Sequence, residues 1–122
     1  MGRPLVPQKK AMNGKVTISP EVVLQVARIT TLATPGVLGL VEDESRHSAS
    51  AGGSLKHTLR GIVASIEDGA AHISVHIIAA SNVPLARLAR QIQTNIANAI
   101  AEIAGIETAA VDVTVEDVRA VA

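Results

Sequence analysis

The feature that most constrains the fold is the pair Asp68-Gly69, which separates two runs of strand-forming residues. Asp-Gly readily supplies the positive backbone dihedrals of a type I′ turn, so residues 59–67 and 71–80 are expected to form an antiparallel hairpin. Side chains alternate along a strand, which places Ile73, Val75, Ile77 and Ala79 on one side and His72, Ser74, His76, Ile78 and Ala80 on the other. The first side is predicted to face the core.

A first helix is predicted to begin after residue 19. Ser19 can cap it, Pro20 suits its first turn, and Glu21 complements the positive helix end. Thr34-Pro35-Gly36 should end it, because Pro35 disfavours helical geometry at Thr34 and Gly36 lets the chain reverse. The spacing predicts a buried stripe of Val22, Val26, Ile29 and Ala33.

A second helix is predicted over residues 83–104, capped by Ser81 or Asn82 and ended by Gly105. It would be about 33 Å long at ~1.5 Å per residue, which matches a ten-residue strand at ~3.3 Å per residue. Helix and hairpin are therefore expected to lie against each other. The predicted buried stripe is Leu85, Leu88, Ile92, Ile96, Ala99 and Ile103.

Three further strands complete the predicted sheet: a short one at residues 16–19, one at residues 37–41 and one at residues 110–118. In the last strand Val111, Val113 and Val115 alternate with Asp112, Thr114 and Glu116, so one face should be buried and one wet. The expected order is β-α-β-β-β-α-β with a short first strand. This order predicts an α+β two-layer sandwich, with a mixed or antiparallel sheet and both helices on one face.

The chain of 122 residues is expected to hold one domain, at residues 14–118. Residues 1–13 carry three basic residues and two prolines with no acid, and are predicted to be a disordered basic leader. Residues 119–122 are expected to be a tail. Residues 42–57 are rich in Ser and Gly and are expected to form a mobile loop, in which the Gly-Gly-Ser-Leu-Lys segment lacks the spacing of a phosphate loop.

The composition argues against several classes of function. No Cys, Phe, Trp or Tyr is present, which removes thiol chemistry, Cys-ligated zinc and aromatic stacking on bases, sugars or flat cofactors. Lys and Arg together number 11, as do Asp and Glu, so no net charge attracts nucleic acid or an anionic membrane. The serines form no nucleophile-elbow motif. We therefore expect no enzyme activity, no catalytic residue and no cofactor. RNA binding through the basic leader, Arg87 and Arg90 is the weakest of the alternatives.

One alternative is a small-ligand or metal-binding module on the exposed sheet face. His72 and His76 would lie about 13 Å apart on a strand at ~3.3 Å per residue, too far to share one ion. A site with one histidine would need a cross-strand carboxylate such as Asp112 or Glu116. His47 and His57 belong to the predicted loop, and Arg87 and Arg90 near the start of the second helix are candidates for binding an anion.

The remaining prediction is association with proteins. Open strand edges can pair with another chain, and Val63, Ile78, Ala80, Ala109 and Ala110 add small apolar patches near the outer face of the sheet. No apolar run reaches the ~18 residues of a membrane span, and the N-terminus lacks the features of a signal peptide. We expect a cytoplasmic protein.

Three segments also bear a family resemblance: Gly14-Lys15-Val16-Thr17-Ile18-Ser19-Pro20-Glu21-Val22, Thr34-Pro35-Gly36-Val37, and the stretch from Ala86 through Gln93 to Gly105, Val111, Val113 and Val115. In this order they resemble the bacterial alkaline shock protein family, also called the Gls-type envelope stress response family. The resemblance covers residues 14–118. Where the family usually has Tyr-Gly or a similar pair after the hairpin, this chain has Ala80-Ser81-Asn82.

The resemblance implies a non-enzymatic scaffold or adapter that acts in cell-envelope homeostasis and stress tolerance. Family members are cytoplasmic and self-associate, and some are held near the membrane by a separate anchor protein with a related domain. The expected partners are therefore a second copy of the chain and a membrane-anchored protein.

Overall fold

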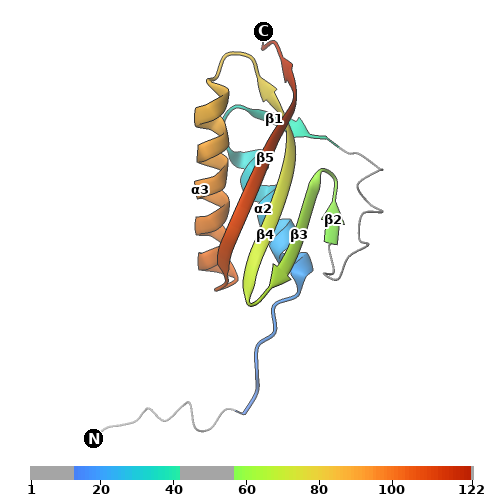
Figure 1. The fold of residues 1–122 in the computed structure, drawn as a ribbon, viewed down its shortest axis with the longest axis vertical. Coiled ribbons are helices and arrows are strands. Elements are labelled where there is room, and N and C mark those ends of the chain that lie inside the picture. Colours follow the sequence, from blue (N-terminus) through green and yellow to red (C-terminus); the bar gives the residue numbers. More distant parts are fainter. Residues whose placement is uncertain (1–12, 42–56, 122) are drawn as a thin grey trace, which may run out of the picture.

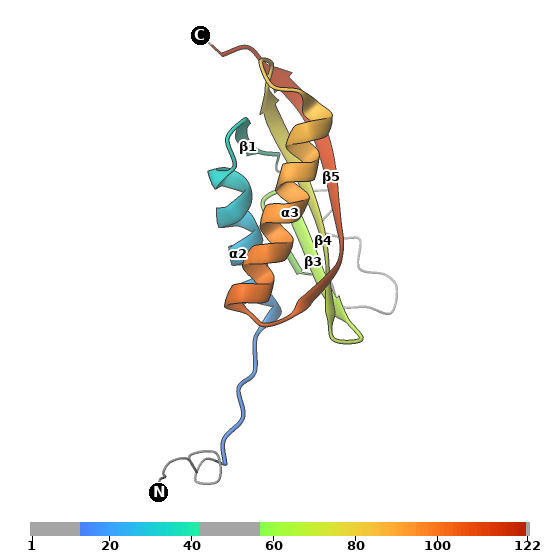
Figure 2. The same ribbon diagram turned by 90° about the vertical axis from the view of Figure 1, so that its left-hand side faces the viewer.

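Two layers, one of helices and one of strands, make up the computed structural model, which describes residues 13–41 and 57–121 (Figures 1 and 2). The elements follow in the order α2 (Pro20–Ala33), β1 (Val37–Leu40), β2 (His57–Leu59), β3 (Ile62–Glu67), β4 (Ala70–Ala80), α3 (Leu85–Ile103) and β5 (Glu107–Arg119). Residues 1–12 of the predicted leader, residues 42–56 of the predicted loop and residue 122 lie outside the described residues.

β4 is the central strand of the sheet. Along one edge it pairs with β5 in parallel, from Ala70↔Glu107 to Ala80↔Arg119. The other edge is shared by two antiparallel strands, since β3 pairs with residues 70–75 and β1 with residues 77–79. β2 pairs with the far edge of β3. Both helices cover one face of this mixed sheet (Figure 2), so the predicted α+β two-layer sandwich is confirmed.

His76 lies where β3 and β1 meet along β4. Its N–H donates to the Gly61 carbonyl oxygen at 2.9 Å, and its carbonyl accepts from the Val41 N–H at 2.9 Å. The end of β1 and the start of β3 are therefore held at the same point of the central strand.

Two tight turns shape the antiparallel part of the sheet. Asp68 and Gly69 have φ of +54° and +79°, as a type I′ turn requires, so the predicted hairpin is confirmed. Arg60 and Gly61, at φ +37° and +84°, make a second reversal that sequence analysis missed. The strand expected to begin at residue 59 consequently begins at Ile62, and residues 57–59 fold back on it as β2.

The strand predicted at residues 16–19 is wrong. Residues 13–19 form no strand and lead away from the body of the molecule (Figures 1 and 2), and Val16 is 89% exposed. Both edges of the central strand are occupied by β5 on one side and by β3 and β1 on the other, so no place beside β4 is open. Within the described residues the first element is a helix. The sheet still has five strands, because the unpredicted strand β2 is present.

The cap of α2 is as predicted, since Ser19 Oγ accepts the Glu21 N–H at 3.1 Å. The predicted buried stripe is mostly wrong, because Val22, Ile29 and Ala33 are exposed and only Val26 is buried. Because α2 packs against both α3 and the sheet, the buried side of the helix is an arc of residues adjacent to the predicted stripe. That arc consists of Val23, Leu24, Val26, Ala27 and Thr31.

α3 buries Leu88, Ile92, Ile96 and Ile100 in a row of four-residue steps. Ile103, predicted to be buried, is 64% exposed, and Leu85 is also exposed, while Ala99 packs at the margin of the core. The N-cap position is Pro84, not Ser81 or Asn82, which lie in the preceding turn. Gly105 follows the helix end at φ +71°, as expected. β5 continues to Arg119, one residue past the predicted boundary of the domain.

Candidate protein-interaction surface

The outer face of the sheet is the face that the helices leave uncovered (Figure 2). Strand alternation and the register assign to it mostly polar or small side chains from three strands, together with the apolar Val63 and Ile78. These outer-face residues are Val63, Ser65 and Glu67 on β3, His72, Ser74, His76 and Ile78 on β4, and Ala110, Asp112, Thr114 and Glu116 on β5.

His76 and Glu116 form the tightest polar pair on this face. His76 Nδ1 lies 2.7 Å from Glu116 Oε2, and the histidine side chain is only 8% exposed. The register of β4 and β5 shifts between Ile77↔Val115 and Ile78↔Asp117, so Glu116 occupies a bulge. His76 Nε2 also lies 3.5 Å from Ser74 Oγ. Of the two cross-strand carboxylates considered from sequence, the structure brings Glu116 to a histidine.

His72 has a different neighbour. Its Nε2 lies 3.9 Å from Glu67 Oε1 across the hairpin, with both side chains about two-fifths exposed. Asp112 lies opposite Ser74 in the register and borders, with His72, a small depression of about 150 Å³. Within residues 13–41 and 57–121 there is no group of three or more His, Cys, Asp or Glu side chains arranged to hold a metal ion.

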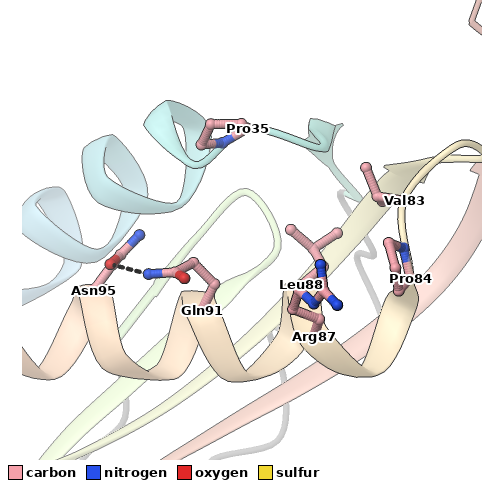
Figure 3. A pocket seen from close by; sticks show the side chains of 7 residues that line it. All are labelled: Pro35, Val83, Pro84, Arg87, Leu88, Gln91 and Asn95. Atoms are coloured by element: carbon pink, nitrogen blue, oxygen red, sulfur yellow. Dashed lines mark hydrogen bonds between the residues drawn. The ribbon is translucent and has the colours of Figure 1, made fainter.

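A second depression, of about 390 Å³, lies between the end of α2 and the start of α3 (Figure 3). Gln91 Nε2 donates to Asn95 Oδ1 at 2.9 Å at its rim, and Asn95 Nδ2 donates to Thr34 Oγ1 at 3.2 Å. Arg87 contributes to the lining, whereas Arg90 does not, so the two candidate anion-binding arginines do not form one site. The other lining residues are Pro35, Val83, Pro84 and Leu88.

The exposed side of α2 carries an apolar stripe, which we call the α2 stripe: Val22, Ile29, Leu32 and Ala33. Ile29 is 61% exposed and Leu32 is 39% exposed. Their spacing of three, four and seven residues places them along one line of the helix surface. Three of these four residues were predicted to be buried. Their helical periodicity does mark one face of the helix, but this apolar face is accessible.

The outer edge of β5 is a further open feature. In the described part of the chain, β4 is the only strand that pairs with β5. Gln93 of α3 reaches this strand, where its Nε2 donates to the Val111 carbonyl oxygen at 2.9 Å. Open strand edges are expected from the sequence, whereas the contact of Gln93 with β5 is not.

None of the helices in the described residues is long and apolar enough to cross a membrane.

Two solved structures illustrate similarity to this fold. One, titled as a zinc form of a MamM CTD variant, has a TM-score of 0.44 at 13% identity and covers 80% of this chain and 84% of that chain. Another, titled MamM-CTD 215-293, has a TM-score of 0.43 at 13% identity and covers 80% of this chain and 96% of that chain. No curated protein matches the sequence.

The family comparison agrees with the resemblance of the three sequence segments. The model of the alkaline shock protein 23 family, described as having a cell envelope-related function, matches residues 8–120. This range includes every helix and strand of the described residues. The chain is therefore a member of the alkaline shock protein 23 family, with a role related to the cell envelope.

Proposed function

We propose that the protein is a non-enzymatic scaffold or adapter that acts in cell-envelope homeostasis by associating with itself and with other proteins. The observation that carries this proposal is the α2 stripe. A helix that already buries Val23, Leu24 and Ala27 also exposes Ile29 and Leu32 on its other side. An exposed apolar row on a helix surface gains free energy when a partner covers it.

The contacts of the polar side chains on the outer face support a structural role for these side chains. His76 is largely buried and in contact with Glu116, and Ser65 Oγ donates to Glu67 Oε2 at 3.4 Å. General acid–base catalysis needs a titratable group placed beside a bound substrate, in a cleft that excludes water. The depression next to His72 is small, about 150 Å³, and the His72 side chain beside it is about two-fifths exposed.

The proposed partners are a second copy of the chain and a membrane-anchored protein with a related domain. The cell envelope-related description of the family supports such a location. In this proposal the protein is cytoplasmic and reaches the membrane through its partner.

Sedimentation velocity of the purified chain over a range of concentrations tests the proposal. We expect reversible association that is weakened by the double substitution Ile29→Glu and Leu32→Glu, because two charges on the stripe would have to be desolvated in the complex. Thr94→Glu with Asn98→Glu adds the same charge at exposed positions of α3 and is the matched control. A wild-type chain that stays monomeric at high concentration would contradict the proposal.

A further inference from the structure

The outer edge of β5 presents the backbone groups that a further strand would need. β5 is 13 residues long, and in the described residues only its β4 side is paired with a strand. Backbone N–H and C=O groups along such an edge form hydrogen bonds with any extended segment that can lie beside them. The edge is also acidic, because β5 carries Glu107, Asp112, Glu116 and Asp117 but only one basic residue, Arg119.

A second part of the chain has the complementary properties. Residues 15–19, Lys-Val-Thr-Ile-Ser, are β-branched or polar in strict alternation and contain no proline. They precede α2 as a non-helical segment with no strand pairing, and the Val16 side chain is almost fully exposed. The segment thus has the sequence of a strand but lacks a sheet to join.

The direction of this segment argues against pairing with the sheet of its own chain. It leaves the start of α2 and leads away from the sheet of its own chain (Figures 1 and 2). We propose that residues 15–19 of one copy add as an extra strand to the β5 edge of a second copy. This inference rests on the proposed function, in that it takes self-association as what the chain does, and it names one contact by which copies join.

Alternation along the two strands sorts their side chains consistently. Val16 and Ile18 share one side of the added strand and extend the row of Val111, Val113 and Val115, which packs against the helix layer. Lys15 and Thr17 then lie on the outer face. Lys15 is placed among the acidic residues of that face, of which Asp112 is exposed. Opposite charges on neighbouring strands stabilise the pairing, and a one-residue slip would reverse every side chain.

Gln93 occupies part of the same edge. Its amide donates to the Val111 carbonyl oxygen, the kind of acceptor that an incoming strand N–H would use. The side chain of Gln93 is exposed and can leave without disturbing the core. It therefore competes with the added strand and sets the strength of the contact.

The contact is heterologous, since the segment of one copy meets the edge of another. Each copy that donates its segment still has an open edge, and each acceptor still has a free segment. Such contacts produce rings when the rotation closes and longer assemblies when it does not.

The first test removes hydrogen-bond donors from the segment. Val16→Pro with Ile18→Pro deletes two backbone N–H groups at positions outside any helix or strand of the chain. We expect association to weaken about tenfold or more, from the usual net value of a hydrogen bond. The melting temperature should stay that of the wild type under conditions where both are monomeric. Val16→Ile with Ile18→Val keeps every N–H group and should associate like the wild type.

The second test places the segment directly. The chain has no cysteine, so introduced thiols are the only ones present. A Thr17→Cys chain mixed with a Thr114→Cys chain should form a mixed disulfide on mild oxidation, because both positions lie on the outer face. A Thr17→Cys chain mixed with an Asp68→Cys chain, which carries its thiol on the exposed hairpin turn, should not. Adding Val16→Pro with Ile18→Pro to the Thr17→Cys chain should abolish the Thr114 crosslink.

The results separate this inference from the proposed function. If the proline variant associates like the wild type, or the Asp68 control crosslinks as readily as Thr114, the strand contact is wrong. Should the Ile29→Glu and Leu32→Glu variant still lose association in that case, self-association through the α2 stripe stands. A wild-type chain that does not associate at all overturns both.

Discussion

His76 Nδ1 lies 2.7 Å from Glu116 Oε2, across the parallel pairing of β4 and β5 and at the position where the register shifts. A carboxylate only accepts hydrogen bonds, so the imidazole donates from Nδ1. The buried histidine joins two strands through this bond, and its own backbone joins two more through Gly61 and Val41.

Glu116→Ala should therefore destabilise the fold. Removing the acceptor leaves a largely buried imidazole N–H without this partner, and we expect a loss of about 1–2 kcal/mol in the free energy of unfolding. Asp112→Ala, at an exposed outer-face position of the same strand, should change it by less than about 0.5 kcal/mol. Urea unfolding followed by circular dichroism measures both. Equal losses would argue against a specific role for the His76–Glu116 pair.

Gly61→Ala should be more harmful than Gly69→Ala. Both glycines have positive φ, at +84° and +79°. A Cβ at Gly61 would lie 2.5 Å from the Val41 carbonyl oxygen, whereas a Cβ at Gly69 has nothing within 4 Å. We expect a loss of about 1 kcal/mol at Gly69 from the backbone conformation, and at least about 2 kcal/mol more at Gly61 from the clash. Thermal unfolding of the two variants compares them, and similar melting temperatures would be inconsistent with the close approach.

Thr31→Val should stabilise the protein. Thr31 is fully buried, and its Oγ1 has no hydrogen-bond partner within the described residues. Val has nearly the same shape and removes the cost of burying an unsatisfied hydroxyl, so a gain of about 1 kcal/mol is expected. Thr30→Val, at a partly exposed neighbouring position, is the control for any change in helix propensity. A loss of stability at position 31 would show that the hydroxyl is satisfied in solution.

Ile96→Ala and Ile103→Ala distinguish the observed core from the predicted one. Ile96 is fully buried and Ile103 is mostly exposed. The first substitution should cost about 2–5 kcal/mol through lost burial and cavity formation, and the second less than about 1 kcal/mol. Chemical denaturation of the two variants gives the comparison. A large cost at position 103 would place that side chain against the core.

Gln93→Ala should strengthen self-association. The substitution frees the Val111 carbonyl on the β5 edge, and Ala favours the helix at least as well as Gln does. A gain of up to about tenfold in the association constant corresponds to one net hydrogen bond. Gln91→Ala, on the same helix but at the rim of the other depression, should leave association unchanged. Sedimentation velocity measures both, and weaker association of Gln93→Ala would mean that the amide belongs to the contact.

Local signals in the sequence were sufficient where one residue pair dictates the backbone. Asp68-Gly69 specified its turn, Ser19 its cap and Gly105 the end of α3, because each acts through its own dihedrals or nearest hydrogen bonds. The core face of β4 could be predicted from the alternation of side chains along a strand. Its predicted residues, Ile73, Val75, Ile77 and Ala79, are all buried.

The buried arc of α2 was not predictable in this way. The helix is apolar on two sides, so Val22, Ile29 and Ala33 satisfy the helical period as well as Val23, Ala27 and Thr31 do. Only packing against α3 and the sheet selects between them. Residues 16–19 illustrate a second limit of prediction from sequence. Strand propensity indicates that a segment suits a sheet, but it does not identify the sheet that the segment joins.

Val41 and Gly61 both form backbone hydrogen bonds with His76. These bonds fix the positions of both ends of the segment that joins β1 to β3. Because those ends are set by the central strand, insertions or deletions between positions 41 and 57 would leave the strand register intact.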